Sequence, residues 1–145
     1  MKDARVICLG SWPGSTKSHI EIESFEFLEG LANSKDLRFL SLQGVSIINK
    51  LPESIGNHRN LMILDLKECY NLEVLSGEIA KLTNLMYWDL SDCYLLPAMP
   101  KGLSSLSELR VFKGFVISNS QSRSSVSSLD DLKELTKPRD RKSVV

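Results

Sequence analysis

Three cysteines and two histidines are the residues of this 145-residue sequence that could hold a metal ion or act as nucleophiles or bases. Cys69 and Cys93 lie 24 residues apart, without a Cys-x-x-Cys pair anywhere, and neither His19 nor His58 falls at a matching position. A structural zinc needs four ligands, so we expect buried, unreactive thiols and no metal or other cofactor. Cys8 is expected to point outward. We interpret His58 as a partly buried side chain satisfied by a backbone group.

Two aspartates, Asp65 and Asp89, recur at the same interval of 24 residues. Paired carboxylates can act as general acid and base when they are sunk in an apolar pocket. Here each lies between two apolar positions of an alternating segment, so we expect both to be solvated, where like-charge repulsion costs only about 1 kcal/mol. No Ser-His-Asp or Cys-His arrangement with a supporting motif is found either. The sequence therefore predicts that this chain is not an enzyme.

The interval that separates these residues is a repeat that runs through most of the chain. Segments 37–42, 61–66, 85–90 and 109–114 carry leucines or other apolar residues in matching positions, and each begins 24 residues after the one before. The units read L-x-x-L-x-L-x-x-C with substitutions, which is leucine-rich-repeat spacing. The position written C is filled by small or medium apolar residues, namely Val45, Cys69, Cys93 and Ile117.

Alternating apolar residues in the first half of each unit predict a short strand, and the later leucines predict a return along the outside of the coil. We therefore predict an α/β solenoid, a leucine-rich-repeat horseshoe segment with a parallel concave sheet and an irregular or short-helical convex side. Trp88 and Phe112 share the inward position of Leu40 and Leu64, so both aromatics are interpreted as core.

The predicted domain boundaries follow the repeat. Leucine-rich repeats are expected over residues 4–117, with regular units from 37 and an earlier strand at 4–9 whose step to the next is 33 residues. The extra residues include a turn cluster at 12–16, followed by an apolar return segment at 20–31. Residues 118–128 contain seven serines and are expected to form a solvated linker. Residues 129–136 predict a short helix of an incomplete repeat, and 137–145 a frayed tail.

The chain resembles a known family at residues 51–56 (LPESIG) and 60–66 (NLMILDL). These segments are similar to the "LP-x-x-I-G … NL-x-x-LDL" step in the leucine-rich-repeat region of plant intracellular nucleotide-binding disease-resistance proteins of the coiled-coil type. Cysteine instead of asparagine at 69 and 93 favours this family over extracellular receptors. The likeness covers about residues 4–136. The phosphate-binding loop of such receptors is missing here, so we expect a fragment, a truncated receptor or a short paralogue.

The resemblance implies a cytoplasmic protein-interaction module of a plant innate immune receptor, which recognises a pathogen effector or a guarded host protein, or restrains the receptor's own other domains. The alternatives are an intracellular leucine-rich-repeat signalling scaffold and a fragment of a receptor-kinase ectodomain. The lack of a signal-peptide core and of any Asn-x-Ser/Thr glycosylation site disfavours the ectodomain. A balance of 18 basic and 18 acidic residues argues against nucleic-acid or membrane partners.

The outward positions of the predicted strands are the candidate binding surface. One column of them is apolar, and its flanking columns carry mixed charge, which is typical of surfaces that contact proteins. The predicted protein-binding residues are Phe39, Ile63, Asp65, Lys67, Tyr87, Asp89, Val111 and Lys113.

Overall fold

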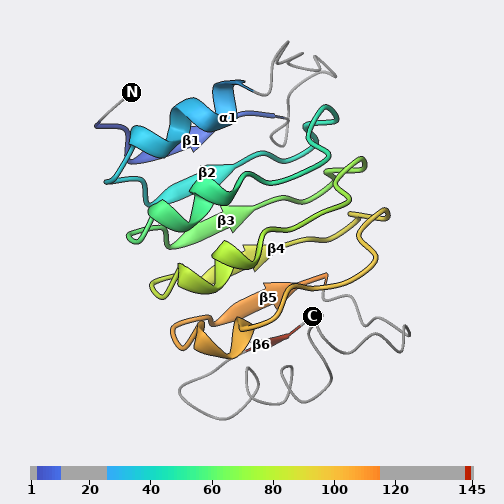
Figure 1. Ribbon diagram of the computed structural model, residues 1–145. Coiled ribbons are helices and arrows are strands. Elements are labelled where there is room, and N and C mark those ends of the chain that lie inside the picture. Colours follow the sequence, from blue (N-terminus) through green and yellow to red (C-terminus); the bar gives the residue numbers. More distant parts are fainter. Residues whose placement is uncertain (1–2, 11–25, 115–142, 145) are drawn as a thin grey trace.

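The computed structural model describes residues 3–10, 26–114 and 143–144, which form a coil of stacked repeats (Figure 1). Each strand pairs in parallel with the next strand along the chain, so the six strands of the described residues follow sequence order across one sheet. This confirms the predicted parallel solenoid. The strands are β1 (Val6–Cys8), β2 (Phe39–Ser41), β3 (Ile63–Asp65), β4 (Tyr87–Asp89), β5 (Val111–Lys113) and β6 (Ser143–Val144).

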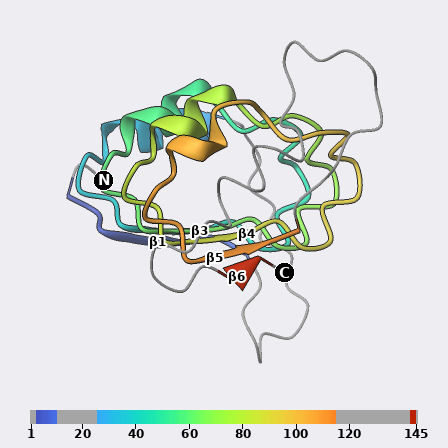
Figure 2. The same cartoon turned by 90° about the horizontal axis from the view of Figure 1, so that it is seen from below.

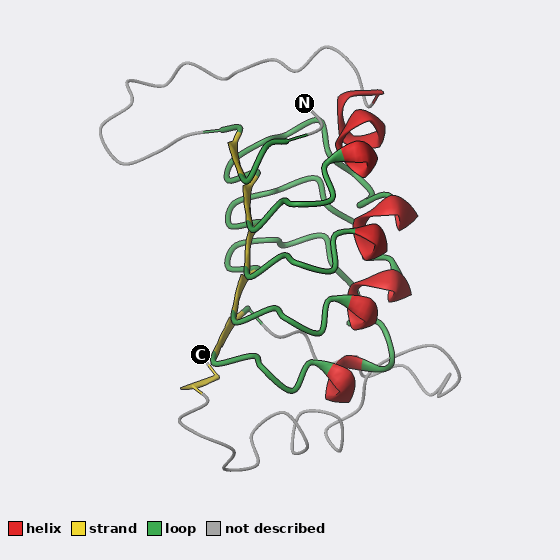
Figure 3. Cartoon of the chain, turned by 90° about the vertical axis from the view of Figure 1, so that its left-hand side faces the viewer, coloured by secondary structure: helices red, strands yellow, loops and turns green. Residues whose placement is uncertain are grey.

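Short helices lie on the opposite side of the coil from the sheet (Figure 2). The line of strands bows toward the helices, which makes the outer face of the sheet concave and confirms the short-helical convex side (Figure 3). Most of these helices are 3-10 turns, because a 24-residue unit leaves room for little more than one turn. The helices are α1 (Glu26–Gly30), η1 (Leu31–Asn33), η2 (Glu53–Asn57), η3 (Gly77–Lys81) and η4 (Leu103–Ser105). Within the described ranges, none of them has the length and apolar character that a membrane span requires.

The core fills the space between the sheet and the helices. Leu40, Leu64, Trp88 and Phe112 occupy one register position on β2 to β5, and all four are buried. The rings of Trp88 and Phe112 stack with centroids 4.6 Å apart and planes 7° apart. Both aromatics are therefore core residues, as predicted. The second inward column, Leu42, Leu66 and Leu90, is buried as well.

Polar side chains of one repeat hydrogen-bond to backbone carbonyls of the repeat before. His58 is buried, and its Nδ1 lies 3.0 Å from the carbonyl oxygen of Ser34, so the expected backbone partner is confirmed. Burial lowers the pKa of His58, which favours the neutral ring that donates from Nδ1. Asn60 donates to the carbonyl of Lys35 at 3.2 Å, and Asn84 makes the same bond one repeat later. These bonds explain why asparagine precedes two successive units.

At the start of the repeat array the structure confirms the expected strand, and at the end it corrects the expected frayed tail. Val6 pairs with Phe39, so the early strand and its 33-residue step are confirmed. At the other end, β6 pairs with β5, which corrects the expectation that residues 137–145 are all frayed. The open edge of β5 presents unpaired backbone groups that a short Ser-Val segment can satisfy. The turn at 12–16, the first part of the return segment, the linker at 118–128 and the helix at 129–136 lie outside the described residues.

Candidate functional site

The concave face of the sheet brings most of the predicted binding residues together. Phe39, Ile63, Tyr87 and Val111 are register partners on β2 to β5 and form one continuous column. Each of the four is half-buried, because its neighbours in the column cover its sides and leave its outer surface open. Side chains held this way have little rotamer freedom left to lose when a partner binds.

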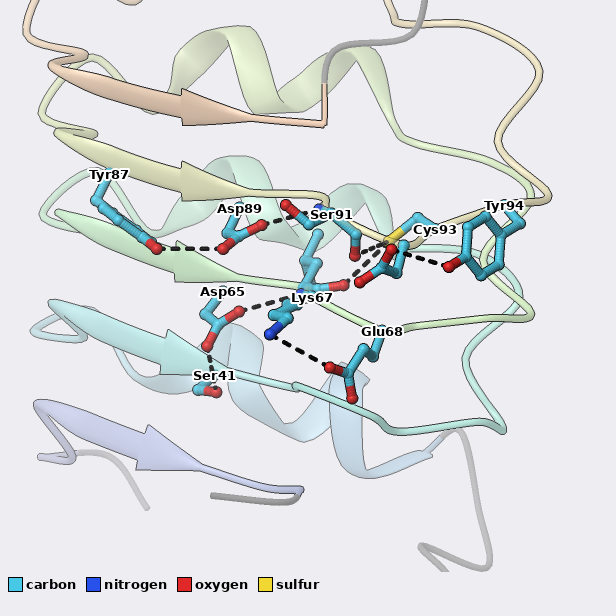
Figure 4. A network of polar contacts seen from close by, with 11 residues as sticks. Ser41, Asp65, Lys67, Glu68, Tyr87, Asp89, Ser91, Cys93 and Tyr94 are labelled. Atoms are coloured by element: carbon cyan, nitrogen blue, oxygen red, sulfur yellow. Dashed lines mark hydrogen bonds and ion pairs between the residues drawn. The ribbon is translucent and has the colours of Figure 1, made fainter. Parts of the chain in front are cut away.

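A polar column runs beside the apolar one, and hydrogen bonds hold its carboxylates in place (Figure 4). Ser41 Oγ donates to Asp65 Oδ2 at 3.2 Å across the β2–β3 pair. The Tyr87 hydroxyl donates to Asp89 Oδ2 at 3.2 Å, and the backbone N–H of Ser91 donates to Asp89 Oδ1 at 2.8 Å. The carboxylates therefore act as fixed acceptors that orient a hydroxyl and a chain turn.

The two aspartates differ in burial, and this corrects one expectation. Asp65 is half-buried, whereas Asp89 is only 5% exposed instead of solvated. Tyr87 lies two residues earlier on the same face, and its phenol reaches over the Asp89 carboxylate. Ile63 holds the corresponding place beside Asp65 and has no group that can make this bond.

The predicted site contains two lysines, one in the polar column on β5 and one that follows β3. Lys113 Nζ stands 5.7 Å from the centroid of the Tyr87 ring, which is cation–π range. Lys67 follows β3 rather than lying within it, and its Nζ is 3.3 Å from Glu68 Oε1. Burial, followed by the charge of Asp89, raises the pKa of Tyr87, so the phenol stays protonated and keeps its hydrogen bond at neutral pH. The face can therefore offer an aromatic ring, carboxylates and ammonium groups to a partner.

Cys69 and Cys93 have the burial that the sequence predicted. Their Sγ atoms donate to the carbonyl oxygens of Leu42 and Leu66, each at 3.1 Å. Burial raises the pKa of Cys69 to about 12 and that of Cys93 to about 11. Cys8 is exposed, as expected for its outward position. In the part of the chain that the structure describes, no group of three or more His, Cys, Asp or Glu side chains could hold a metal ion.

The buried thiols lead to a first prediction. At pH 8, iodoacetamide should modify Cys8 in the native chain and leave Cys69 and Cys93 unmodified, because their thiolate populations are depressed roughly a hundredfold or more and their sulfurs are covered. Mass spectrometry should find one adduct on the native chain and three after denaturation. Rapid native labelling of Cys69 would contradict the buried geometry.

An exposed patch that the sequence analysis did not select lies on the loops that follow β2, β3 and β4. Five of the six large apolar side chains that are exposed in the described residues occur there, namely Ile47, Tyr70, Val74, Tyr94 and Leu95. We call this set the loop-edge patch. The rings of Tyr70 and Tyr94 stack with centroids 5.9 Å apart. The signal that could have revealed the patch is the recurrence of tyrosine at 70 and 94, one repeat apart.

A shallow depression of about 260 Å³ lies where the strands begin, whereas the loop-edge patch lies beyond the point where they end. Its lining combines two asparagines, two methionines and two charged residues: Arg38, Asn60, Met62, Asn84, Met86 and Glu108. Met62 and Met86 immediately precede β3 and β4, so the depression continues the concave face toward the start of the strands.

One comparison with protein families agrees with this architecture. The sequence matches the family described as "Leucine-rich repeat region" over residues 5–139. No curated protein matches the chain. Among solved structures, an internalin (inlF) from Listeria monocytogenes is similar, with a TM-score of 0.47 and 20% sequence identity; the alignment covers 63% of this chain and 26% of the internalin. The chain thus spans about a quarter of the length of that protein.

Proposed function

Because the chain belongs to the leucine-rich-repeat region family, a class of protein-interaction repeat modules, we propose that its concave face serves recognition in plant innate immunity. In this proposal the chain acts in the cytoplasm as part of an intracellular immune receptor. Its partner is a pathogen effector, a guarded host protein or another domain of the same receptor. The motifs at 51–56 and 60–66, together with cysteine at 69 and 93, support the plant receptor reading.

One observation carries the proposal of a binding face, the unbroken apolar column of Phe39, Ile63, Tyr87 and Val111. The column crosses four strands, and its centre is occupied by an aromatic side chain whose hydroxyl is fixed by Asp89. Aromatic anchors near the middle of an interface commonly contribute most of its binding energy. A preordered anchor also reduces the entropy lost on binding.

The charges beside the column support a protein partner. The carboxylates of Asp65 and Asp89 lie on one strand pair, Lys113 continues their column on β5, and Lys67 follows β3. Such a mixture forms the polar rim that surrounds the apolar centre of many protein interfaces. We propose that this face binds its partner and catalyses no reaction.

The test is made in the complete receptor that contains this segment. Tyr87→Ala and Ile63→Ala are expected to weaken effector-triggered cell death, each corresponding to about a tenfold loss of binding, because interface anchors typically contribute more than about 1.4 kcal/mol. Glu53 is an exposed residue of the convex helix η2, so Glu53→Ala is the matched control and should signal normally.

Circular dichroism of the 145-residue chain should show that all three variants keep the native fold. Undiminished signalling by both concave-face variants would contradict the proposed surface. A full-length gene without an adjoining nucleotide-binding domain would instead favour the signalling scaffold.

A further inference from the structure

Two acidic residues in left-handed backbone conformations stand next to the aromatic pair of the loop-edge patch. Glu68 has φ of 59° and Asp92 has φ of 64°, and each precedes a patch tyrosine, Tyr70 or Tyr94, by two residues. Gly44, one repeat earlier, occupies the equivalent position with φ of 74°. The repeat therefore imposes this conformation on whichever residue stands there.

Glycine meets the demand for a positive φ without strain, whereas a residue with a side chain is strained in that conformation. The carboxylates at 68 and 92 are thus not what the backbone of this turn favours. Asp92 Oδ1 accepts a hydrogen bond of 2.9 Å from the Tyr94 hydroxyl, so at least one of them orients a patch tyrosine.

The tyrosine pair offers an aromatic surface to solvent. Tyr94 is 74% exposed and Tyr70 is 46% exposed, although their rings stack on each other with planes only 14° apart. The ring of Tyr94 buries little area, so it contributes little to the stability of the coil. Exposed tyrosines of this kind are enriched where one protein binds another.

The electrostatic surroundings of the rings are negative. Asp92 and Glu68 flank the pair, and the exposed Glu73 follows Tyr70 by three residues. Lys67 compensates the charge of Glu68, so the excess negative charge comes from Asp92 and Glu73. The hydrogen bond and charge of Asp92, and further the charge of Glu68, raise the pKa of Tyr94. Since the whole chain has equal numbers of basic and acidic residues, this negative field is a local property of the patch.

We propose that the loop-edge patch binds an arginine side chain of a basic protein segment, with the guanidinium stacked on Tyr94 and its N–H groups directed to the carboxylate of Asp92, which lies against that ring. A planar guanidinium stacks on an aromatic ring and donates in its own plane to carboxylates at the same time. A lysine ammonium can be attracted to the ring but lacks this planar fork. The Lys67–Glu68 ion pair joins this surface to the border of the concave face, but the proposed arginine contacts do not depend on the function proposed above.

The experiment uses the 145-residue chain and a fluorescent peptide in which arginines alternate with glycine and serine. Fluorescence anisotropy should show that this peptide binds at least about threefold more tightly than the matched lysine peptide. Tyr94→Ala should weaken binding about tenfold, and Tyr94→Phe should retain most of it because the ring remains.

Asp92→Gly separates binding from folding. It should weaken arginine-peptide binding severalfold while leaving the melting temperature unchanged or raised, because glycine relieves the positive φ. Glu53→Gln removes one carboxylate on the convex side and is the matched charge control, so it should bind the peptide normally.

Equal binding of the lysine peptide, undiminished binding by Tyr94→Ala, or no binding of either peptide would overturn the proposal. Self-association that depends on Tyr94, detected by sedimentation without peptide, would assign the patch to a second copy of the chain and would overturn it too. Loss of signalling in concave-face variants tests a different surface, so the two proposals can fail independently.

Discussion

Replacing Trp88 by alanine is expected to lower the free energy of unfolding by about 3 to 5 kcal/mol. The indole is fully buried and stacks on Phe112, so its removal leaves a cavity between two neighbouring repeats. The two neighbouring repeats cannot close this cavity without breaking the hydrogen bonds that join β4 to β5. Chemical denaturation followed by far-ultraviolet circular dichroism measures the loss.

Trp88→Phe is the informative control for this prediction. Trp88 Nε1 is buried and has no hydrogen-bond partner among the described residues, and an unsatisfied donor costs about 1 to 3 kcal/mol. Phenylalanine loses apolar area but also removes this donor, so the two effects should largely cancel. A loss from Trp88→Phe as large as that from Trp88→Ala would show that the indole N–H contributes a stabilising contact.

Replacing Asp89 by alanine should lower the unfolding free energy by about 2 kcal/mol. Its carboxylate is nearly inaccessible and accepts hydrogen bonds from the Ser91 backbone and the Tyr87 hydroxyl, and alanine leaves both donors without that acceptor. Tyr87 would also become free to rotate, so the same substitution should weaken signalling if the chain is part of the proposed immune receptor. Equilibrium denaturation and the cell-death assay measure the two effects.

Asp65→Ala provides the matched comparison at the same repeat position. Asp65 accepts hydrogen bonds from Ser41 Oγ and the Lys67 backbone, but it is half-buried, so water can replace the missing acceptor. We expect a loss of about 1 kcal/mol or less. An equal loss at both positions would mean that burial of Asp89 does not set its contribution.

The fold followed from sequence because one period decides which side chains meet. A step of 24 residues places Leu40, Leu64 and Trp88 in one register, and parallel pairing of short strands is then the arrangement that buries all of them. The leucines on the convex side follow the same 24-residue period and are buried for the same reason. The pairing of β6 with β5 could not be predicted from the sequence. The segment before β6 is long and carries no regular repeat, so it does not specify the register of that strand.

From the sequence, the binding face could be predicted only as columns of outward-pointing residues, without the burial of each side chain. Repeat position told which residues point outward, and it did so correctly for Ile63 and Tyr87. It could not tell that Asp89 is buried, because that depends on the length and hydroxyl of one neighbour, Tyr87, where the previous repeat has Ile63. The loop-edge patch was not predicted for a related reason. The exposure of Tyr94 depends on loop geometry, which the leucine spacing does not specify.

The stacking of repeats also sets how the chain can fold in time. In the described residues, side-chain hydrogen bonds between neighbouring repeats join positions 24 to 27 apart. Each repeat therefore closes a loop of nearly equal length when it docks, and the longer 33-residue step from β1 to β2 adds only ~0.3 kcal/mol of closure entropy. Because chain distance hardly discriminates between repeats, we expect packing to decide where folding starts, with the aromatic pair between β4 and β5 as the first repeat contact to form.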